Sequence, residues 1–147
     1  MLDFINQLPN LKALRIEHIQ LTKSKYLSIK KTNAFSTLRN TNKITKVSFK
    51  HIDKLEEVQF FLDLCPLLTY VEVDCGRDYK LFVRLFLTQT CAETTSYLRT
   101  IGLSVPLAIE EIVREIKAMI DSEKLVEEYT TKYVSHRLFY WLQLQWK

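Results

Sequence analysis

The chain has 147 residues, 47% of them apolar and 26% charged, with a net charge of +4. This length and composition are typical of one globular domain that can bury a hydrophobic core. The longest apolar runs are far shorter than the roughly 18 residues of a membrane-spanning helix, and Met1 to Asn6 lack the features of a secretion signal. We therefore expect no membrane association and an intracellular protein, cytoplasmic or nuclear.

Charge is distributed unevenly along the chain. Residues 12–54 contain 11 Lys and Arg but only two acidic residues. Acidic residues outnumber basic ones in the rest of the chain. If the elements stack in chain order, one end of the molecule is expected to be basic and the other acidic.

The first part of the chain predicts a helix, a strand and a long basic stretch. Met1 to Leu8 supply at most one helix, and the motif Leu11-x-x-Leu14-x-Ile16 predicts a strand. Residues 18–43 then lengthen this first unit as a strand or loop followed by a short helix near Ala34 to Leu38.

The same L-x-x-L-x-L motif returns three times, and each copy is followed by a helical pattern. The later copies begin at Ile44, Leu68 and Leu98. Apolar residues three and four apart predict helices over 55–65, 79–86 and 109–120. Apolar and polar residues alternate within the strands, which favours a sheet with one wet face. A doubly wound sheet, covered on both faces, is the less favoured alternative.

The pattern changes after Ser122. Leu125 to Val134 and Arg137 to Trp146 alternate as two extended segments with a turn near Ser135. Residues 123–147 are therefore predicted to be a hairpin that caps the last unit. The aromatic residues of this segment are interpreted as filling the open end of that unit rather than as a recognition patch; they are Phe139, Tyr140, Trp141 and Trp146.

Together these elements predict a single α/β domain over residues 1–147. Its architecture is expected to be a short, irregular leucine-rich-repeat solenoid of about four to five strand–helix units. Strands would line the concave face and helices the convex face.

Two segments resemble the leucine-rich repeats of F-box proteins. They are LPNLKALRI at Leu8 to Ile16 and LCPLLTYVEVDC at Leu64 to Cys75, each a helix end, a proline and a repeat strand. The closing LQWK at Leu144 to Lys147 also resembles the end of some members of F-box-type families. This resemblance implies a non-catalytic module like the substrate-recognition repeats of a ubiquitin-ligase receptor. Since no F-box precedes the repeats, a link to a ubiquitin ligase is expected only through a missing F-box, in a fragment or truncated relative of a longer protein.

The residues between the motif leucines are expected to project from the concave face and to bind a protein partner. They run from basic to acidic to small: Arg15, Glu17, Lys46, Ser48, Lys50, Tyr70, Glu72, Asp74 and Thr100. Arg15 and Tyr70 are the best anchors, because Arg and Tyr are enriched at interface hot spots. The alternative interpretation is a solvated face with cross-strand charge pairs, such as Lys50 with Asp74.

A second candidate function is nucleic-acid or anionic-surface binding through residues 23–54. Its basic patch comprises Lys23, Lys25, Lys30, Lys31 and Lys43. Tyr26 and Phe35 are the only aromatic residues between Lys23 and Lys46, too few for a base-stacking platform. A solvated loop is the simpler interpretation.

Residues with catalytic or metal-binding chemistry are scattered. His18, His51 and His136 are far apart in the sequence, and the three cysteines, Cys65, Cys75 and Cys91, have no metal-ligand spacing. We therefore expect no enzyme activity, no cofactor and no metal.

Overall fold

The computed structural model describes residues 2–52, 54–74, 76–92, 97–105, 109–135 and 140–147. The helices are α1 (Leu2–Asn6), α2 (Lys23–Lys30), α3 (Asn33–Thr41), α4 (Leu55–Leu64), α5 (Tyr79–Ala92) and α6 (Ile109–Glu123). The strands are β1 (Ala13–Ile16), β2 (Lys46–Phe49), β3 (Tyr70–Asp74), β4 (Thr100–Val105), β5 (Tyr129–Ser135) and β6 (Tyr140–Trp146). Among the described helices, none combines the length and apolar character needed to cross a membrane.

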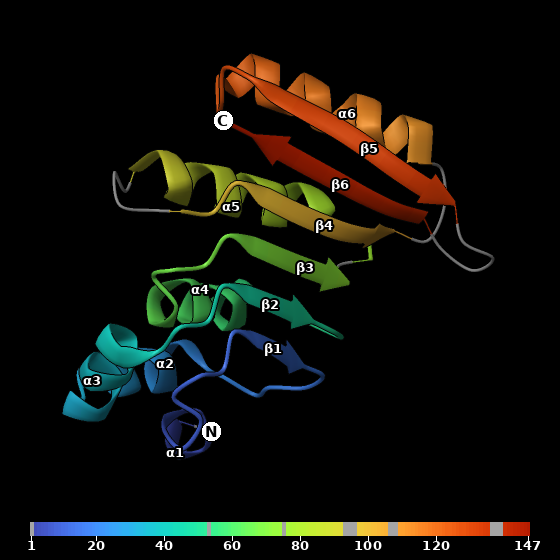
Figure 1. Ribbon diagram of the computed structural model, residues 1–147. Helices are drawn as coiled ribbons and strands as arrows, with labels where there is room; N and C mark the ends of the chain where they lie inside the picture. Colours follow the sequence, from blue (N-terminus) through green and yellow to red (C-terminus); the bar gives the residue numbers. More distant parts are fainter. Residues whose placement is uncertain (1, 53, 75, 93–96, 106–108, 136–139) are drawn as a thin grey trace.

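The strands form one six-stranded sheet in the order β1-β2-β3-β4-β6-β5 (Figure 1). The first four strands are parallel and lie side by side in chain order. β6 pairs antiparallel with β4, and β5 pairs antiparallel with β6. After α6 the chain therefore enters the outer strand β5 and then returns as β6 to pair with β4.

The predicted leucine-rich-repeat solenoid with a capping hairpin is wrong. A solenoid stacks each unit on the previous one in chain order, but β6 runs antiparallel to β4 and separates it from β5. The connections are also unequal, because two helices join β1 to β2 and a single helix joins each of the next two strand pairs. The chain forms a mixed α/β sheet in which the hairpin supplies two full strands, and the repeat resemblance loses its structural basis.

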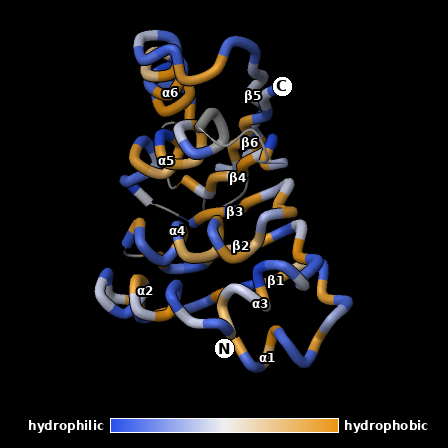
Figure 2. Tube along the Cα trace, turned by 90° about the vertical axis from the view of Figure 1, so that its left-hand side faces the viewer, coloured by the Kyte–Doolittle hydropathy of each residue, from blue (hydrophilic) through white to orange (hydrophobic). Residues whose placement is uncertain are grey.

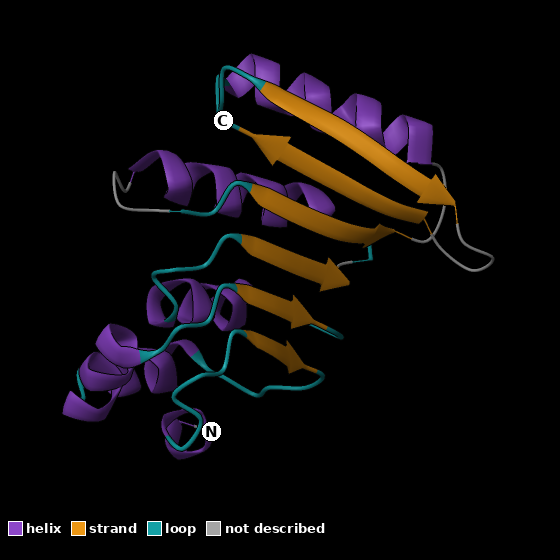
Figure 3. Ribbon diagram, viewed as in Figure 1, coloured by secondary structure: helices purple, strands orange, loops and turns teal. Residues whose placement is uncertain are grey.

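Helices α4, α5 and α6 lie on the same side of the sheet (Figures 2 and 3). The strand residues that face this side form the centre of the core and are nearly inaccessible: Val47, Phe49, Val71, Val73, Ile101, Leu103, Leu142, Leu144 and Trp146. Their neighbours along β2 and β3 are half-buried or exposed. The alternation in the sequence thus corresponds to a sheet with one covered and one accessible face.

Residues 18–43 contain the short helix predicted near Ala34 to Leu38, as part of α3, but α2 lies where a strand or loop was predicted. They contain two helices, α2 and α3, each preceded by a threonine in extended conformation. The hydroxyl oxygen of Thr22 accepts from Lys25 N at 3.3 Å, and that of Thr32 accepts from Phe35 N at 3.2 Å. These N-caps satisfy amides that a helix start leaves unpaired, so the two threonines help to begin helices in a stretch of weak apolar periodicity.

Asn42 connects the ends of two helices to the start of β2. Its side-chain amide donates to the carbonyl oxygens of Leu38 (2.7 Å) and Leu64 (2.8 Å), while its oxygen accepts from Ile44 N at 3.2 Å. The residue is 8% exposed, so water cannot easily replace these partners. One side chain therefore fixes α3 and α4 relative to the sheet.

Asn42→Ala is expected to lower the free energy of unfolding by about 2 to 4 kcal/mol, because it leaves several buried polar groups unpaired. Chemical denaturation measures the change. Asn40→Ala, an exposed asparagine in the same helix, is the matched control and should stay within about 0.5 kcal/mol of the parent. Equal effects of the two substitutions would contradict this role of Asn42.

Candidate functional site

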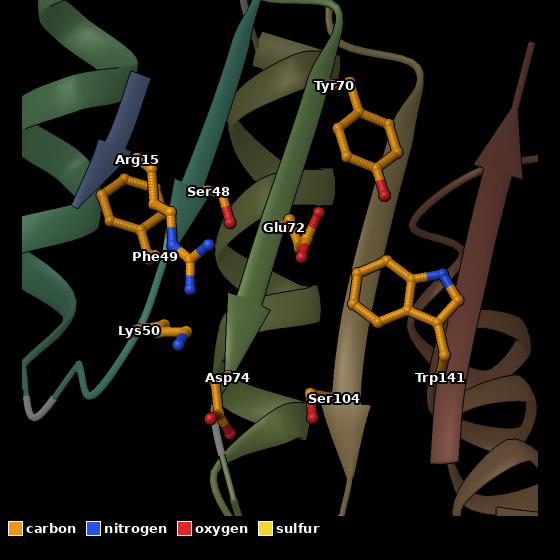
Figure 4. A pocket seen from close by; sticks show the side chains of 9 residues that line it. All are labelled: Arg15, Ser48, Phe49, Lys50, Tyr70, Glu72, Asp74, Ser104 and Trp141. Atoms are coloured by element: carbon orange, nitrogen blue, oxygen red, sulfur yellow. The ribbon is translucent and has the colours of Figure 1, made fainter. Parts of the chain in front are cut away.

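An open hollow of ≈ 690 Å³ lies on the sheet face opposite the helices. Its lining comes from β1, β2, β3, β4 and β6 and from the residue after β2 (Figure 4). The residues are Arg15, Ser48, Phe49, Lys50, Tyr70, Glu72, Asp74, Ser104 and Trp141. Six of the nine predicted partner-binding residues are thus brought to one place.

Strand register explains why residues so distant in the sequence meet. Arg15 pairs with Ser48 and Ser48 with Glu72 across the parallel strands. One pleat further along, Asp74 pairs with Ser104, and Ser104 pairs with Trp141 across the antiparallel junction. Residues opposite each other in neighbouring strands project from the same face, so the hollow is crossed by rows of side chains.

Trp141 lies against β4 at Gly102. A Cβ atom at residue 102 would lie 2.1 Å from Cζ2 and 2.4 Å from Cη2 of the indole, and 2.8 Å from the hydroxyl oxygen of Tyr70. No side chain larger than hydrogen fits beneath rings this close. In Figure 4 the hydroxyl of Tyr70 points toward the indole. Gly102 therefore allows Tyr70 and Trp141 to form a joint aromatic surface, which we call the aromatic platform.

The charges beside the platform are partly compensated. The ammonium of Lys46 lies 4.0 Å from a carboxylate oxygen of Glu72 and 4.6 Å from the ring centroid of Tyr70. Burial, together with the nearby charge of Glu72, raises the pKa of Tyr70 to about 12, so its phenol stays neutral at physiological pH. Within the described residues no ion pair joins Lys50 to Asp74, so the cross-strand pair expected from the sequence is not formed there.

The remaining predicted face residues lie around the hollow rather than in its lining. Glu17 follows β1 and forms an exposed ion pair with Arg15 at 3.7 Å. Thr100 opens β4 and is half-buried. Lys46 contacts Tyr70 and Glu72 as described above.

Three lining residues are not among the predicted ones: Phe49, Ser104 and Trp141. The Phe49 ring is buried on the helix side, against Phe61, so only Ser104 and Trp141 add side chains to the accessible face. Trp141 was interpreted as filling the end of the last unit, yet it alternates with the buried Leu142 and Leu144 and so faces the other side of β6. That alternation was the available signal. Trp146 is buried, with 4% exposure, but it lies on a strand inside the sheet and not at the open end of a repeat; Phe139 lies outside the described residues.

The predicted basic patch occurs on and around two helices. Lys23, Lys25 and Lys30 lie in α2, Lys31 is its C-cap, and Lys43 follows α3. The ammonium of Lys30 lies 2.7 Å from the carboxylate of Asp63, which raises the pKa of Lys30 and compensates its charge. The other four are exposed, so the patch has fewer uncompensated charges than the sequence suggested.

The structure brings together two histidines that are distant in the sequence. The rings of His18 and His51 stack with centroids 5.3 Å apart, whereas His136 lies outside the described residues. Burial raises the pKa of the Cys65 thiol to about 12. No group of three or more potential metal-ligating side chains occurs among the residues that the structure describes.

Comparison with known proteins does not identify a family. No family model and no curated protein matches the chain. Among solved structures, the chain is similar to a human methyltransferase 10 domain containing protein, with 10% sequence identity, a TM-score of 0.45, and coverage of 97% of this chain and 77% of that one. The correction of the fold above therefore rests on the strand order of this chain's own sheet.

Gly102→Ala is expected to push the Trp141 indole away from β4 and expose it to solvent. In a Trp146→Phe background Trp141 is the only tryptophan, so acrylamide quenching of its fluorescence should rise, with a stability loss of about 1 to 3 kcal/mol. Ser48→Ala, on the same face but away from the indole, is the control and should leave quenching unchanged. Unaltered quenching in the Gly102→Ala variant would contradict the seating of Trp141.

Proposed function

We propose that this chain is a non-catalytic module that binds a polypeptide partner across the accessible face of its sheet. The observation that carries the proposal is the convergence of Arg15, Tyr70, Glu72 and Trp141 on one open hollow. Because helices cover only one face of the sheet, the side chains on its other face are available to another molecule (Figure 4).

The chemistry of the hollow suits a protein surface. Arg, Tyr and Trp are the residues most enriched among interface hot spots, and all three types line it. Basic side chains on the β1 side adjoin acidic ones from β3, and such a pattern orients a charged partner and excludes wrong ones. Its open form and breadth over five strands favour a polypeptide over a small molecule, which usually binds in an enclosed pocket.

Nucleic acid is a less suitable occupant of this face. Glu72 and Asp74 stand in the middle of the hollow and would repel phosphates. The basic side chains of α2 lie outside its lining, and Lys30 among them is already paired with Asp63. Binding that falls steeply between low and moderate salt, and is lost when Lys23 and Lys25 are changed to Glu, would favour nucleic acid instead.

Site-specific photocrosslinking tests the proposal. p-Benzoylphenylalanine replacing Ser48 lies in the hollow, and the same group replacing Lys117 lies on the exposed side of α6. Irradiation in extracts of the native host should give discrete protein adducts from position 48 that position 117 does not give. The partner identified by mass spectrometry is then purified for direct binding measurements.

Charge reversal then connects binding to the face. Arg15→Glu and Glu72→Arg should each weaken binding of the purified partner by about tenfold or more, as expected for hot-spot residues. Lys117→Glu is the matched control and should bind normally. Adducts formed equally from both positions, or an affinity that neither reversal changes, would overturn the proposal.

A further inference from the structure

The aromatic platform lies on one side of the hollow, next to the carboxylate of Glu72 (Figure 4). Glu72 is the register partner of Gly102, which the indole of Trp141 covers, so the Glu72 side chain rises next to that ring. Asp74 is the partner of Ser104, and Ser104 is the partner of Trp141. Neighbouring strands are about 4.8 Å apart, so the Glu72 side chain stands within reach of a group lying on the indole, whereas Asp74 lies one pleat further along β3.

A lysine of the chain itself shows that the surroundings of Glu72 and Tyr70 attract a cation. The Lys46 ammonium lies beside Glu72 and over the ring of Tyr70, where the electron-rich ring face and the carboxylate both attract positive charge. Lys46 approaches from β2, on the side of Tyr70 away from β6. Asp74 lies one pleat further along β3, away from the indole, and makes no ion pair within the described part of the chain (Figure 4).

We infer that Trp141 and Glu72 form a subsite for an arginine side chain of the partner polypeptide. A guanidinium is planar, so it stacks on an indole while its N–H groups donate to carboxylates at its edge. An ammonium is more strongly hydrated and cannot stack, so lysine is the poorer occupant.

The opposite end of the hollow fixes the orientation of such a partner. Arg15 and Lys50 lie on the β1 and β2 side (Figure 4), and they would attract a carboxylate. About two to three strand spacings separate these basic groups from the arginine subsite, roughly 10 to 14 Å. Alternate residues of an extended peptide project to one side, so an arginine and an acidic residue about four positions apart match this span.

This inference rests on the proposed function, since it names the chemistry of the partner at the same face. It is tested with a small probe that requires no knowledge of the partner. N-acetyl-arginine amide is titrated into the full chain while NMR follows the indole N–H resonance of Trp141. The neutral isostere N-acetyl-citrulline amide and N-acetyl-lysine amide are the comparison probes.

The arginine probe is expected to shift the Trp141 resonance saturably, with a dissociation constant on the order of 1 mM. Lysine should bind about fivefold more weakly, because it lacks the stacking contribution, and citrulline should cause no saturable shift. Glu72→Gln should weaken the arginine probe several-fold, while Asp3→Asn, an exposed acidic residue of α1, should not. Equal responses to arginine and citrulline, or an unchanged response in the Glu72→Gln variant, would overturn the subsite.

The two hypotheses fail separately. If the arginine probe does not bind but position 48 still yields a partner whose affinity falls on charge reversal, the subsite is wrong and the proposed function stands. If the probe binds as predicted but crosslinking gives no face-specific partner, the proposed function is overturned and the subsite remains as a guanidinium-binding site.

Discussion

The antiparallel pairing of β6 with β4 is the interaction on which the rest of the molecule depends. It lines up residues 140–145 with residues 100–105, so that Leu142 and Leu144 are buried on the helix side of the sheet. Because side chains alternate along a strand, the same pairing turns Trp141 to the opposite face, above Gly102. A shift of one residue in this register would exchange the two sets and lose both the core and the aromatic platform.

The coverage of only one sheet face gives the molecule its functional character. Core residues such as Val47, Val71 and Ile101 have no measurable exposure, and burial of such side chains supplies most of the favourable free energy of folding. Side chains on the other face do not have to be apolar, because they are not buried in the core. This face can therefore carry charged and aromatic residues whose arrangement is set by the strands beneath them and whose contacts are left for another molecule.

The local elements of the fold could be predicted from the sequence where periodicity is strong. The four parallel strands and the helix over 109–120 coincide with the motif copies and apolar stripes, apart from boundary shifts of a few residues. The short helix predicted near Ala34 to Leu38 lies within α3, whereas α2 could not be found in this way, since its apolar stripe is weak and its start depends on the cap Thr22. The order of the strands in the sheet could not be predicted either, because alternation identifies a strand but does not say which strand it pairs with.

The candidate site likewise combines residues that a local sequence pattern predicts with residues whose position depends on long-range strand pairing. Residues on β1, β2 and β3 were predicted because each lies between motif leucines, and their convergence follows from parallel register. The alternation with Leu142 and Leu144 could have shown that Trp141 lies on the opposite face of its strand, but its position above Gly102 depends on β6 lying next to β4, which no local pattern reveals. The contact between Gly102 and the indole likewise joins residues whose proximity exists only in the folded sheet.

The nuclear Overhauser effect between Gly102 and Trp141 tests this account most directly. With β6 paired to β4 as described, the α protons of Gly102 should show strong cross-peaks to the Hζ2 and Hη2 protons of the indole, together with a marked upfield shift from its ring current. Cross-peaks from the α protons of Gly102 to the α proton of its register partner Gln143 should accompany them, because these two residues form a non-hydrogen-bonded pair. Absence of both sets of cross-peaks in the folded protein would contradict the β4–β6 pairing and, with it, the aromatic platform.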